Sequence, residues 1–214
     1  MPAPSPMDPD AGSAEWLALS DDLLAGLVHA LNNRVTALSV FAELITLGDS
    51  QMASSGMLTT EVGRLQRLSA QLAMLPARKQ AAEALEIDPV LEDAIALHAQ
   101  HPRIRAIECV VERKGELPPL RAARWALLRL LLLVVHAAKG AAETAHRERV
   151  TLHLIGDADS LTLRVFALGS GGVHAQALAA RCGGAVVQVS DDLQLSLPSL
   201  AETRRREQLV PAAD

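Results

Sequence analysis

The segment LAGLVHALNNRVTALSVFAELI (residues 24–45) has the apolar spacing of a helix that packs against other helices. Apolar residues recur every seven positions, and a second series falls four positions after the first: Leu24, Val28, Leu31, Val35, Leu38, Ala42 and Ile45. A repeat of 3.5 residues is typical of an a/d seam between packed helices. Residues 14–47 contain no proline and one interior glycine, Gly26, so we predict one long helix there.

Four polar residues interrupt this helix: His29, Asn32, Asn33 and Arg34. His29 directly follows Val28, a d position of the seam, and so lies at the flank of the apolar stripe. We expect its imidazole to be exposed and held on a rigid element. A single histidine on a helix is by itself usually a surface residue without chemistry, so the rest of the chain has to show whether this one is used.

A second helix is predicted over residues 52–81, after the stop and turn GDS at residues 48–50. Its apolar side consists of Leu58, Val62, Leu65, Leu68, Leu72 and Leu75. Pro76 is expected to kink this helix or to end it early. Two antiparallel helices cannot bury a full seam alone, so the pattern favours a dimeric four-helix bundle built from two hairpins. The alternative is that the hairpin docks against the rest of its own chain.

Composition limits the class of protein. The chain has 214 residues, of which 50% are hydrophobic and 21% charged, as expected of a soluble globular protein with one large or two small domains. It has two Phe, two Trp and no Tyr, and its net charge is −5. Few aromatic residues and a negative charge both disfavour a nucleic-acid-binding protein.

Cellular context follows from the cysteines and the apolar runs. Cys109 and Cys182 lie far apart without C-x-x-C spacing, which disfavours a disulfide framework or a zinc site and favours a reducing cytoplasm. Residues 1–13 are rich in proline, without the apolar centre of a signal peptide, and are expected to be a disordered lead. The longest apolar run, residues 126–138, is interrupted by Arg129 and His136 and is too short to span a bilayer. We therefore expect a cytoplasmic protein that does not bind membranes.

The second half of the chain mixes helices and strands. The segment at residues 87–100 is expected to start a helix, with Asp88 as its N-cap and Pro89 at its first position. Further elements are predicted as follows: a strand at 106–114, a helix at 121–143, strands at 150–156 and 161–169, a helix at 173–181, a hairpin of strands at 185–190 and 193–198, and a short surface helix within 202–210. This order predicts a mixed, largely antiparallel sheet covered on one face by helices.

The predicted fold class is therefore α+β, with three parts: a disordered lead (1–13), a helical hairpin (14–82) and an α/β sandwich (83–214).

Over about residues 21–198 this arrangement resembles the catalytic core of two-component sensor histidine kinases. The segment HALNN (residues 29–33) matches the phosphoacceptor box of that family, commonly H-E-L-N-N-P, and WALLRLLLLVVHAAKGA (residues 125–141) resembles its asparagine box. The last two strands look like the closing hairpin of the ATP-binding domain, with Gly183 and Gly184 before it. The resemblance implies a sandwich of the GHKL, or histidine-kinase, type.

The sequence departs from the family at the nucleotide site. His136 stands where the family has the asparagine that holds Mg²⁺, and imidazole is a poor ligand for this ion, which prefers hard oxygen ligands. In FALGSGG, Ala167 replaces the aspartate that binds adenine, ahead of Gly169 and Gly171; a lost buried hydrogen bond of this kind costs about 1–3 kcal/mol. The long nucleotide lid is also missing from the sequence. We expect a degenerate domain that binds neither ATP nor a metal.

The resemblance is closest to the dimeric histidine phosphotransferases of phosphorelays. It implies that His29 accepts a phosphoryl group from the aspartyl phosphate of a response-regulator receiver domain. The receiver would bring the Mg²⁺, so the chain itself is expected to hold no cofactor. Neutral imidazole is a good nucleophile near pH 7, and such a transfer depends mostly on positioning. The expected partners are a receiver domain and a second copy of the chain.

The neighbours of His29 refine this interpretation. Asn33 lies one turn along the same face, and the family resemblance implies that it orients water for receiver dephosphorylation. Asn32 would hydrogen-bond backbone or partner. Arg34 stands where the family has proline; it either steadies phosphoryl oxygens or is a solvated surface residue. Kinases usually carry an acidic residue directly after the histidine, where this chain has Ala30, which argues against autokinase activity.

Two alternatives remain open: a non-catalytic pseudokinase that binds a receiver or a kinase, and a divergent active histidine kinase. The other histidines are expected to be ordinary. His98 and His101 are predicted to lie in a solvated turn at a helix end, with a weak metal-binding pair as the alternative. His146, His153 and His174 show no pattern of partners.

Overall fold

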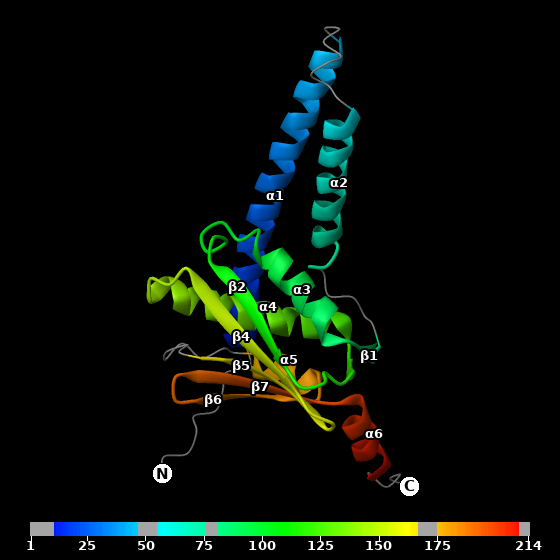
Figure 1. Cartoon of the computed structure of the whole chain (residues 1–214), viewed down its shortest axis with the longest axis vertical. Helices are drawn as coiled ribbons and strands as arrows, with labels where there is room; N and C mark the ends of the chain where they lie inside the picture. The colour runs from blue at the N-terminus through cyan, green and yellow to red at the C-terminus, as the bar shows by residue number, and fades with distance from the viewer. Residues whose placement is uncertain (1–10, 47–54, 76–80, 167–174, 210–214) are drawn as a thin grey trace.

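The computed structural model describes residues 11–46, 55–75, 81–166 and 175–209. In Figure 1 a helical hairpin projects from a unit that contains both helices and a sheet. The predicted fold class, helices together with a mixed sheet, is confirmed at this level.

The hairpin consists of α1 (Ala11–Thr46) and α2 (Ser55–Leu72). The end of the lead, residues 11–13, is helical as part of α1, whereas residues 1–10 and the turn at 48–50 lie outside the described residues. The second helix ends at Leu72, well before residue 81, as expected if Pro76 ends the helix early. The amides of Met74 and Leu75 bond three residues back, to Gln71 and Leu72. This tightening fits a helix that stops ahead of Pro76, because proline disfavours a helical residue before it.

The sheet has five strands: β2 (Glu108–Lys114), β4 (Arg149–Gly156), β5 (Ser160–Val165), β6 (Ala185–Val189) and β7 (Asp192–Pro198). Their order across the sheet is β2-β4-β5-β7-β6. β2 pairs with β4 in parallel, and every other pair in this sheet is antiparallel. The predicted mixed, largely antiparallel sheet is therefore confirmed.

Alternation along the strands defines the core face. One side chain in two is buried along the central strands: Leu152, Leu154, Leu161, Leu163, Val165, Leu193, Leu195 and Leu197. Two helices, α3 (Ile87–His98) and α4 (Arg124–Thr144), pack their leucines into the same buried cluster. Two shorter helices complete the unit: α5 (Gln176–Arg181) and α6 (Leu200–Leu209). Among the described helices, α4 is long and apolar enough to cross a membrane, but 67% of its apolar window is buried inside the protein.

Several local details differ from the sequence predictions. Two three-residue strands, β1 (Glu83–Leu85) and β3 (Leu120–Ala122), form a small antiparallel pair that was not predicted. Because β3 occupies residues 120–122, α4 begins at Arg124 rather than at residue 121. The N-cap of α3 is Glu86 rather than Asp88, whose carboxylate instead accepts a hydrogen bond of 2.8 Å from Arg113 on β2.

The first part of α1 belongs to the core of the α/β unit. Leu19, Leu23 and Leu27 are at most 1% exposed and lie in the same buried cluster as the leucines of α4. In Figure 1 the start of α1 runs beside α4, and its second half projects with α2. The helix that we grouped entirely with the hairpin is thus shared between the hairpin and the α/β unit.

Candidate functional site

His29 lies on α1 just beyond the last buried leucine of that helix, and its side chain is exposed. The ring Nε2 lies 3.3 Å from the side-chain nitrogen Nδ2 of Asn33, one turn further along. Because an amide nitrogen can only donate, Nε2 is the acceptor in this pair and the ring proton is placed on Nδ1. The structure therefore brings two of the predicted site residues together on the exposed side of the helix, with the Nε2 lone pair directed at the Asn33 amide.

The other two predicted residues behave differently. Asn32 is exposed, and its backbone carbonyl accepts a hydrogen bond of 3.0 Å from the hydroxyl of Thr36. Arg34 binds the carboxylate of Glu61 on α2, with Nη1 3.0 Å from Oε2, and Arg64 binds the same carboxylate. Arg34 therefore ties the two helices of the hairpin together, a role that neither of its predicted alternatives included.

This ion pair sits in a sheltered place between the helices. Glu61 is 8% exposed, and the hydrogen bond from Arg34 is the main reason that the pKa of its carboxyl lies below the ordinary value. Arg64 lowers that pKa further, while burial acts in the opposite direction. Glu61 was missed in the sequence because it occupies an ordinary position on an amphipathic helix.

An exposed apolar stripe runs along the hairpin beside His29. Its members are 39–53% exposed: Leu24, Val28, Val35 and Ile45 on α1, and Leu58 and Val62 on α2. Their spacing of four, seven and ten residues places those on each helix along one side. These are residues of the predicted seam, and α1 and α2 do not bury them against each other.

His136, at the place of the family's asparagine, lies in a cluster of three imidazoles. Its Nδ1 is 3.3 Å from Nε2 of His98 on α3, and the ring centroids of His98, His101 and His136 are 5.2 to 5.5 Å apart. His98 and His101 are 0% exposed, so the prediction of a solvated turn is wrong. The reason is tertiary: α1 covers this turn, and Asp22 Oδ2 on α1 lies 3.3 Å from Nε2 of His101.

Burial shifts the titration of these rings. Burial is the main cause that lowers the pKa of His98 to about 3, and the positive charge of Lys139 adds to the effect. Burial also lowers the pKa of His101 and of His136, although Asp22 acts in the opposite direction on both. The cluster is therefore neutral at pH 7.

The glycine segment that was predicted to be degenerate lies outside the described structure, since Ala167, Gly169 and Gly171 fall in residues 167–174. A cavity of about 210 Å³ adjoins the last described residue before it, Phe166. The described residues that line it are Ala138, Ala141, Ala142, Arg147, Arg149, Val150, Thr151, His153 and Phe166. His153 has partners that the sequence did not indicate: its Nδ1 lies 3.3 Å from Glu112 Oε2, and its ring meets Phe166 edge-on.

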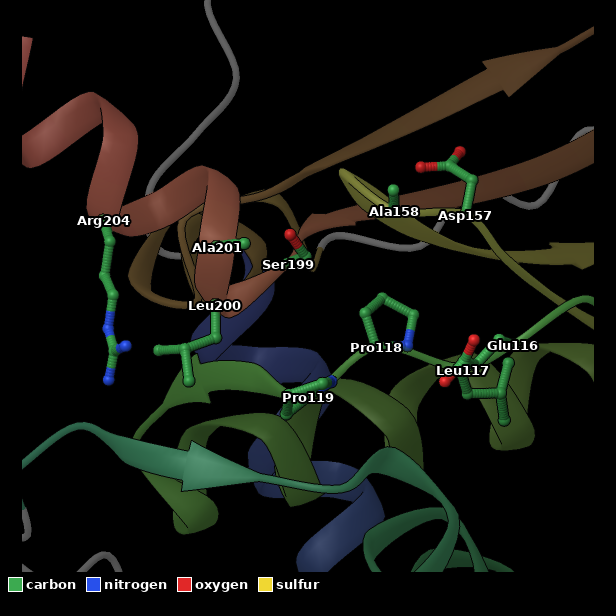
Figure 2. A pocket seen from close by; sticks show the side chains of 10 residues that line it. All are labelled: Glu116, Leu117, Pro118, Pro119, Asp157, Ala158, Ser199, Leu200, Ala201 and Arg204. Atoms are coloured by element: carbon green, nitrogen blue, oxygen red, sulfur yellow. The ribbon is translucent and has the colours of Figure 1, made fainter.

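A larger cavity of about 470 Å³ lies beside the start of α6, at the end of the molecule away from the hairpin. Figure 2 shows Arg204 on one side of it and Asp157 on the other, with Pro118, Pro119 and Leu200 between them. The pKa of Asp157 lies below its ordinary value, mainly because its carboxylate accepts hydrogen bonds from the backbone amides of Asp159 and Ser160 and from the Ser160 hydroxyl. No predicted site residue lines this cavity.

No protein-family model matches the chain, and none of the curated proteins compared with it does. Among solved structures, it is similar to the Acinetobacter baumannii histidine kinase AdeS, with 13% identity and a TM-score of 0.42 over 80% of this chain and 96% of that one. It is also similar to the cytoplasmic segment of histidine kinase QseC, with 14% identity and a TM-score of 0.41 over 64% of this chain and 93% of that one. The ATP-binding domain of PrrB from Mycobacterium tuberculosis is similar too, with 15% identity and a TM-score of 0.42 over 56% of this chain and 98% of that one. Each of these three structures is a histidine kinase by name or is described as an ATP-binding domain.

Proposed function

We propose that this chain is a histidine phosphotransferase-like protein that passes phosphoryl groups between response-regulator receiver domains through His29, without ATP. The observation that carries the proposal is the position of His29: an exposed imidazole on an uninterrupted helix, with Nε2 as the unprotonated nitrogen facing Asn33. A phosphoacceptor needs a nucleophilic lone pair that a partner protein can reach, and this exposed Nε2 provides one once the Asn33 amide moves aside. We place the protein in the cytoplasm, where receiver domains act.

The transfer step follows from this geometry. The Nε2 lone pair attacks the phosphorus of the receiver's aspartyl phosphate in line, and a bond forms between Nε2 and phosphorus. The bond between phosphorus and the acyl oxygen breaks, and the carboxylate stays on the receiver with its Mg²⁺. The phosphorylated ring then releases its Nδ1 proton to solvent, and transfer to a second receiver reverses these steps. Positioning and charge stabilisation dominate such a reaction.

Asn33 acts on the ring in two stages. In the free protein its amide donates to Nε2, at 3.3 Å, and so holds the ring in the reactive tautomer. When phosphorus approaches, the amide leaves the lone pair and donates to a phosphoryl oxygen instead. Asn33 is therefore a positioning residue in this proposal, while Arg34 supports the hairpin through Glu61.

We further propose that the protein acts as a homodimer. Residues such as Val28 and Val35, 48% and 50% exposed, form a stripe of apolar surface that a second hairpin would cover in a four-helix bundle. His29 lies at the flank of this stripe and would stay accessible after pairing. The dimer is thus compatible with a receiver docking at the histidine.

His136 supports the part of the proposal that the transfer does not use ATP. Its Nδ1 is engaged with Nε2 of His98, so the ring that stands at the asparagine position is not free to hold a hydrated Mg²⁺ ion. A second candidate function is a non-catalytic docking module, which the exposed apolar stripe of the hairpin favours, since docking requires only surface.

The test is phosphoryl transfer to the full-length chain. Receiver domains are labelled with a radioactive small-molecule phosphodonor and mixed with wild type, His29→Gln or His146→Gln, which removes an exposed histidine outside the hairpin. We expect acid-labile label on wild type and on His146→Gln, and none on His29→Gln. Stable receiver binding without label would support the docking module. Self-labelling from Mg²⁺-ATP would overturn the proposal and favour a divergent kinase.

A further inference from the structure

The three buried imidazoles lie where the hairpin meets the α/β unit. His98 ends α3, His101 follows it in the loop, and His136 comes from the middle of α4. From the hairpin side, Asp22 of α1 faces His101. One turn later Gly26 of α1 lies against the backbone of Gln100, the residue before His101. The cluster therefore borders the contact between the first part of α1 and the α/β unit, with His101 as the ring that faces α1.

The hydrogen bonds of the cluster require neutral rings. Nδ1 of His101 accepts from the backbone amides of Arg103 and Ile104, at 3.3 and 3.5 Å, so its proton is on Nε2, which faces Asp22. Nε2 of His98 and Nδ1 of His136 face each other at 3.3 Å, where one nitrogen has to donate and the other to accept. If both nitrogens carried a proton, two N–H donors would face each other and the hydrogen bond would be lost.

Nothing in the described surroundings compensates a positive charge on His98. Its Nδ1 is buried and has no hydrogen-bond partner among the described residues. The cation that acts on it from α4 is Lys139, which is itself 2% exposed and lies near Cys109 of β2. Charging a buried group without a counter-ion costs several kcal/mol, so protonation requires that the packing opens.

The charges that face the other two rings are mixed. Asp22 on α1 and Glu143 on α4 favour a proton on His101 and on His136, whereas Arg103 in the loop opposes it. The Asp22 side chain is 46% exposed and is screened by water, so it offsets only part of the cost. The balance of the whole cluster therefore favours neutral rings in the packed state.

We propose that His98, His101 and His136 form an acid-sensitive latch that fastens α1 to the α/β unit while the rings are neutral and releases it when they are protonated.

The direction of the pH dependence follows from the packing. The latch is closed when the rings hold no extra proton, and release returns them to water, where an imidazole has a pKa of about 6.5. The released state therefore binds more protons than the closed one. Closure is fully stable above that pH and weakens as the pH falls below it.

The two tryptophans of the sequence provide a local reporter. Trp16 on α1 and Trp125 on α4 both lie next to Arg129, whose guanidinium carbon is 4.4 Å and 5.4 Å from the two ring centroids. Release of α1 would separate Trp16 from Arg129 and expose it to water. Tryptophan emission thus reports on the latch, while circular dichroism at 222 nm reports on the helices as a whole.

The experiment is a pH titration of the full-length chain from pH 8 to pH 4, followed by both signals in the presence of EDTA. We expect the emission to shift to longer wavelength below pH 6.5, reversibly, while most of the ellipticity is retained. Loss of both signals in one transition would mean global acid unfolding and would overturn the proposal. A transition seen only with added Zn²⁺ would also overturn it, because metal binding would then control the junction.

Variants separate the latch from other titrating groups. In His98→Leu/His136→Leu the buried pair cannot be protonated, and the emission transition is expected to disappear or to move to lower pH. The control His29→Gln, which removes an exposed histidine of α1, should keep the wild-type transition. Should the double variant fail to fold, Asp22→Asn serves as the test. This variant removes the carboxylate that favours protonated His101 and His136 in the packed state. The midpoint of the emission transition should therefore rise by about 0.5 pH unit. An unchanged midpoint in every cluster variant would refute the latch.

Discussion

Gly26 of α1 touches the carbonyl oxygen of Gln100 so closely that a Cβ built on Gly26 would stand 1.7 Å from that oxygen. Glycine in a helix interior normally costs about 1 kcal/mol relative to alanine, so a glycine here indicates that close approach is needed. We expect Gly26→Ala to lower the free energy of unfolding by about 1–3 kcal/mol, because α1 has to move away from the end of α3.

The matched control is Gly140→Ala in α4, where a Cβ would meet nothing within 4 Å. There the substitution should stabilise the protein by up to about 1 kcal/mol. Urea unfolding of both variants measures the difference. Equal effects of the two substitutions would contradict the close contact between α1 and Gln100.

The packing of α1 in the α/β core predicts a second pair of effects. Leu23 is 0% exposed, so Leu23→Ala should cost about 2–5 kcal/mol of unfolding free energy. Val28, five residues later on the same helix, is 48% exposed, and Val28→Ala should cost less than about 1 kcal/mol. Chemical denaturation at low protein concentration tests both, because dilution keeps any pairing of hairpins from masking the result.

Much of this fold could be predicted from the sequence, because its longer elements have clear periods. The seven-residue repeat from Leu24 to Ile45 indicated a long helix, and alternation in the strands indicated a sheet with one buried face. The strands β1 and β3 were missed because three residues are too few to show a period. The burial of His98 and His101 was missed because the residues of α1 that cover them, Asp22 and Gly26, lie more than 70 residues earlier in the chain.

The site was predicted in part for the same reason. His29 and Asn33 share one helix, so their proximity followed from a spacing of four residues. The bond from Arg34 to Glu61 joins two helices, and nothing in the spacing indicates that Glu61, the one acidic residue of α2, faces Arg34 on α1. Contacts within an element could therefore be read from the spacing, and contacts between elements depended on packing.

A third prediction concerns the ion pair between the helices of the hairpin. Arg34 holds the pKa of Glu61 below its ordinary value, so the folded state binds this proton less readily than the unfolded state does. The pair therefore contributes stability above the ordinary carboxyl pKa of about 4.5, and this contribution is lost as the pH falls below it. We expect Glu61→Gln to lower the Tm at pH 7 and to have a smaller effect at pH 3.5. An equal effect at the two pH values would show that the charge of Glu61 is not involved.

A fourth prediction concerns Arg129, which joins three segments. Its guanidinium stacks on Trp16 and Trp125, and its Nη2 donates to the carbonyl of Leu75 at 3.1 Å. Arg129→Met keeps an apolar stem but loses these contacts, at an expected cost of about 1–3 kcal/mol. The tryptophan emission at pH 7 should change as well. Arg206→Met on the exposed face of α6 is the control, and it should leave the emission unchanged.

A fifth prediction concerns the tautomer of His29. Because Asn33 donates to Nε2, nitrogen NMR of the ring should identify Nε2 as the unprotonated nitrogen in the neutral protein. Asn33→Ala should remove this bias, and the shifts should move toward those of a free imidazole. Asn32→Ala, beside it on the same helix, should leave the ring unchanged. A response to Asn32 instead of Asn33 would contradict the assigned hydrogen bond.

The continuity of α1 has a mechanical consequence. A helix of 36 residues is about 54 Å long and behaves as a stiff lever. Its last fully buried leucine is Leu27, and residues 28–46 project together with α2 for about 28 Å, so a rotation of the hairpin by about 10° near Leu27 would carry the far end through about 5 Å. His29 stands two positions past Leu27, close to the fulcrum, and would scarcely move. Such a rotation would therefore displace the distal end of the hairpin while the imidazole of His29 keeps its position beside the α/β unit.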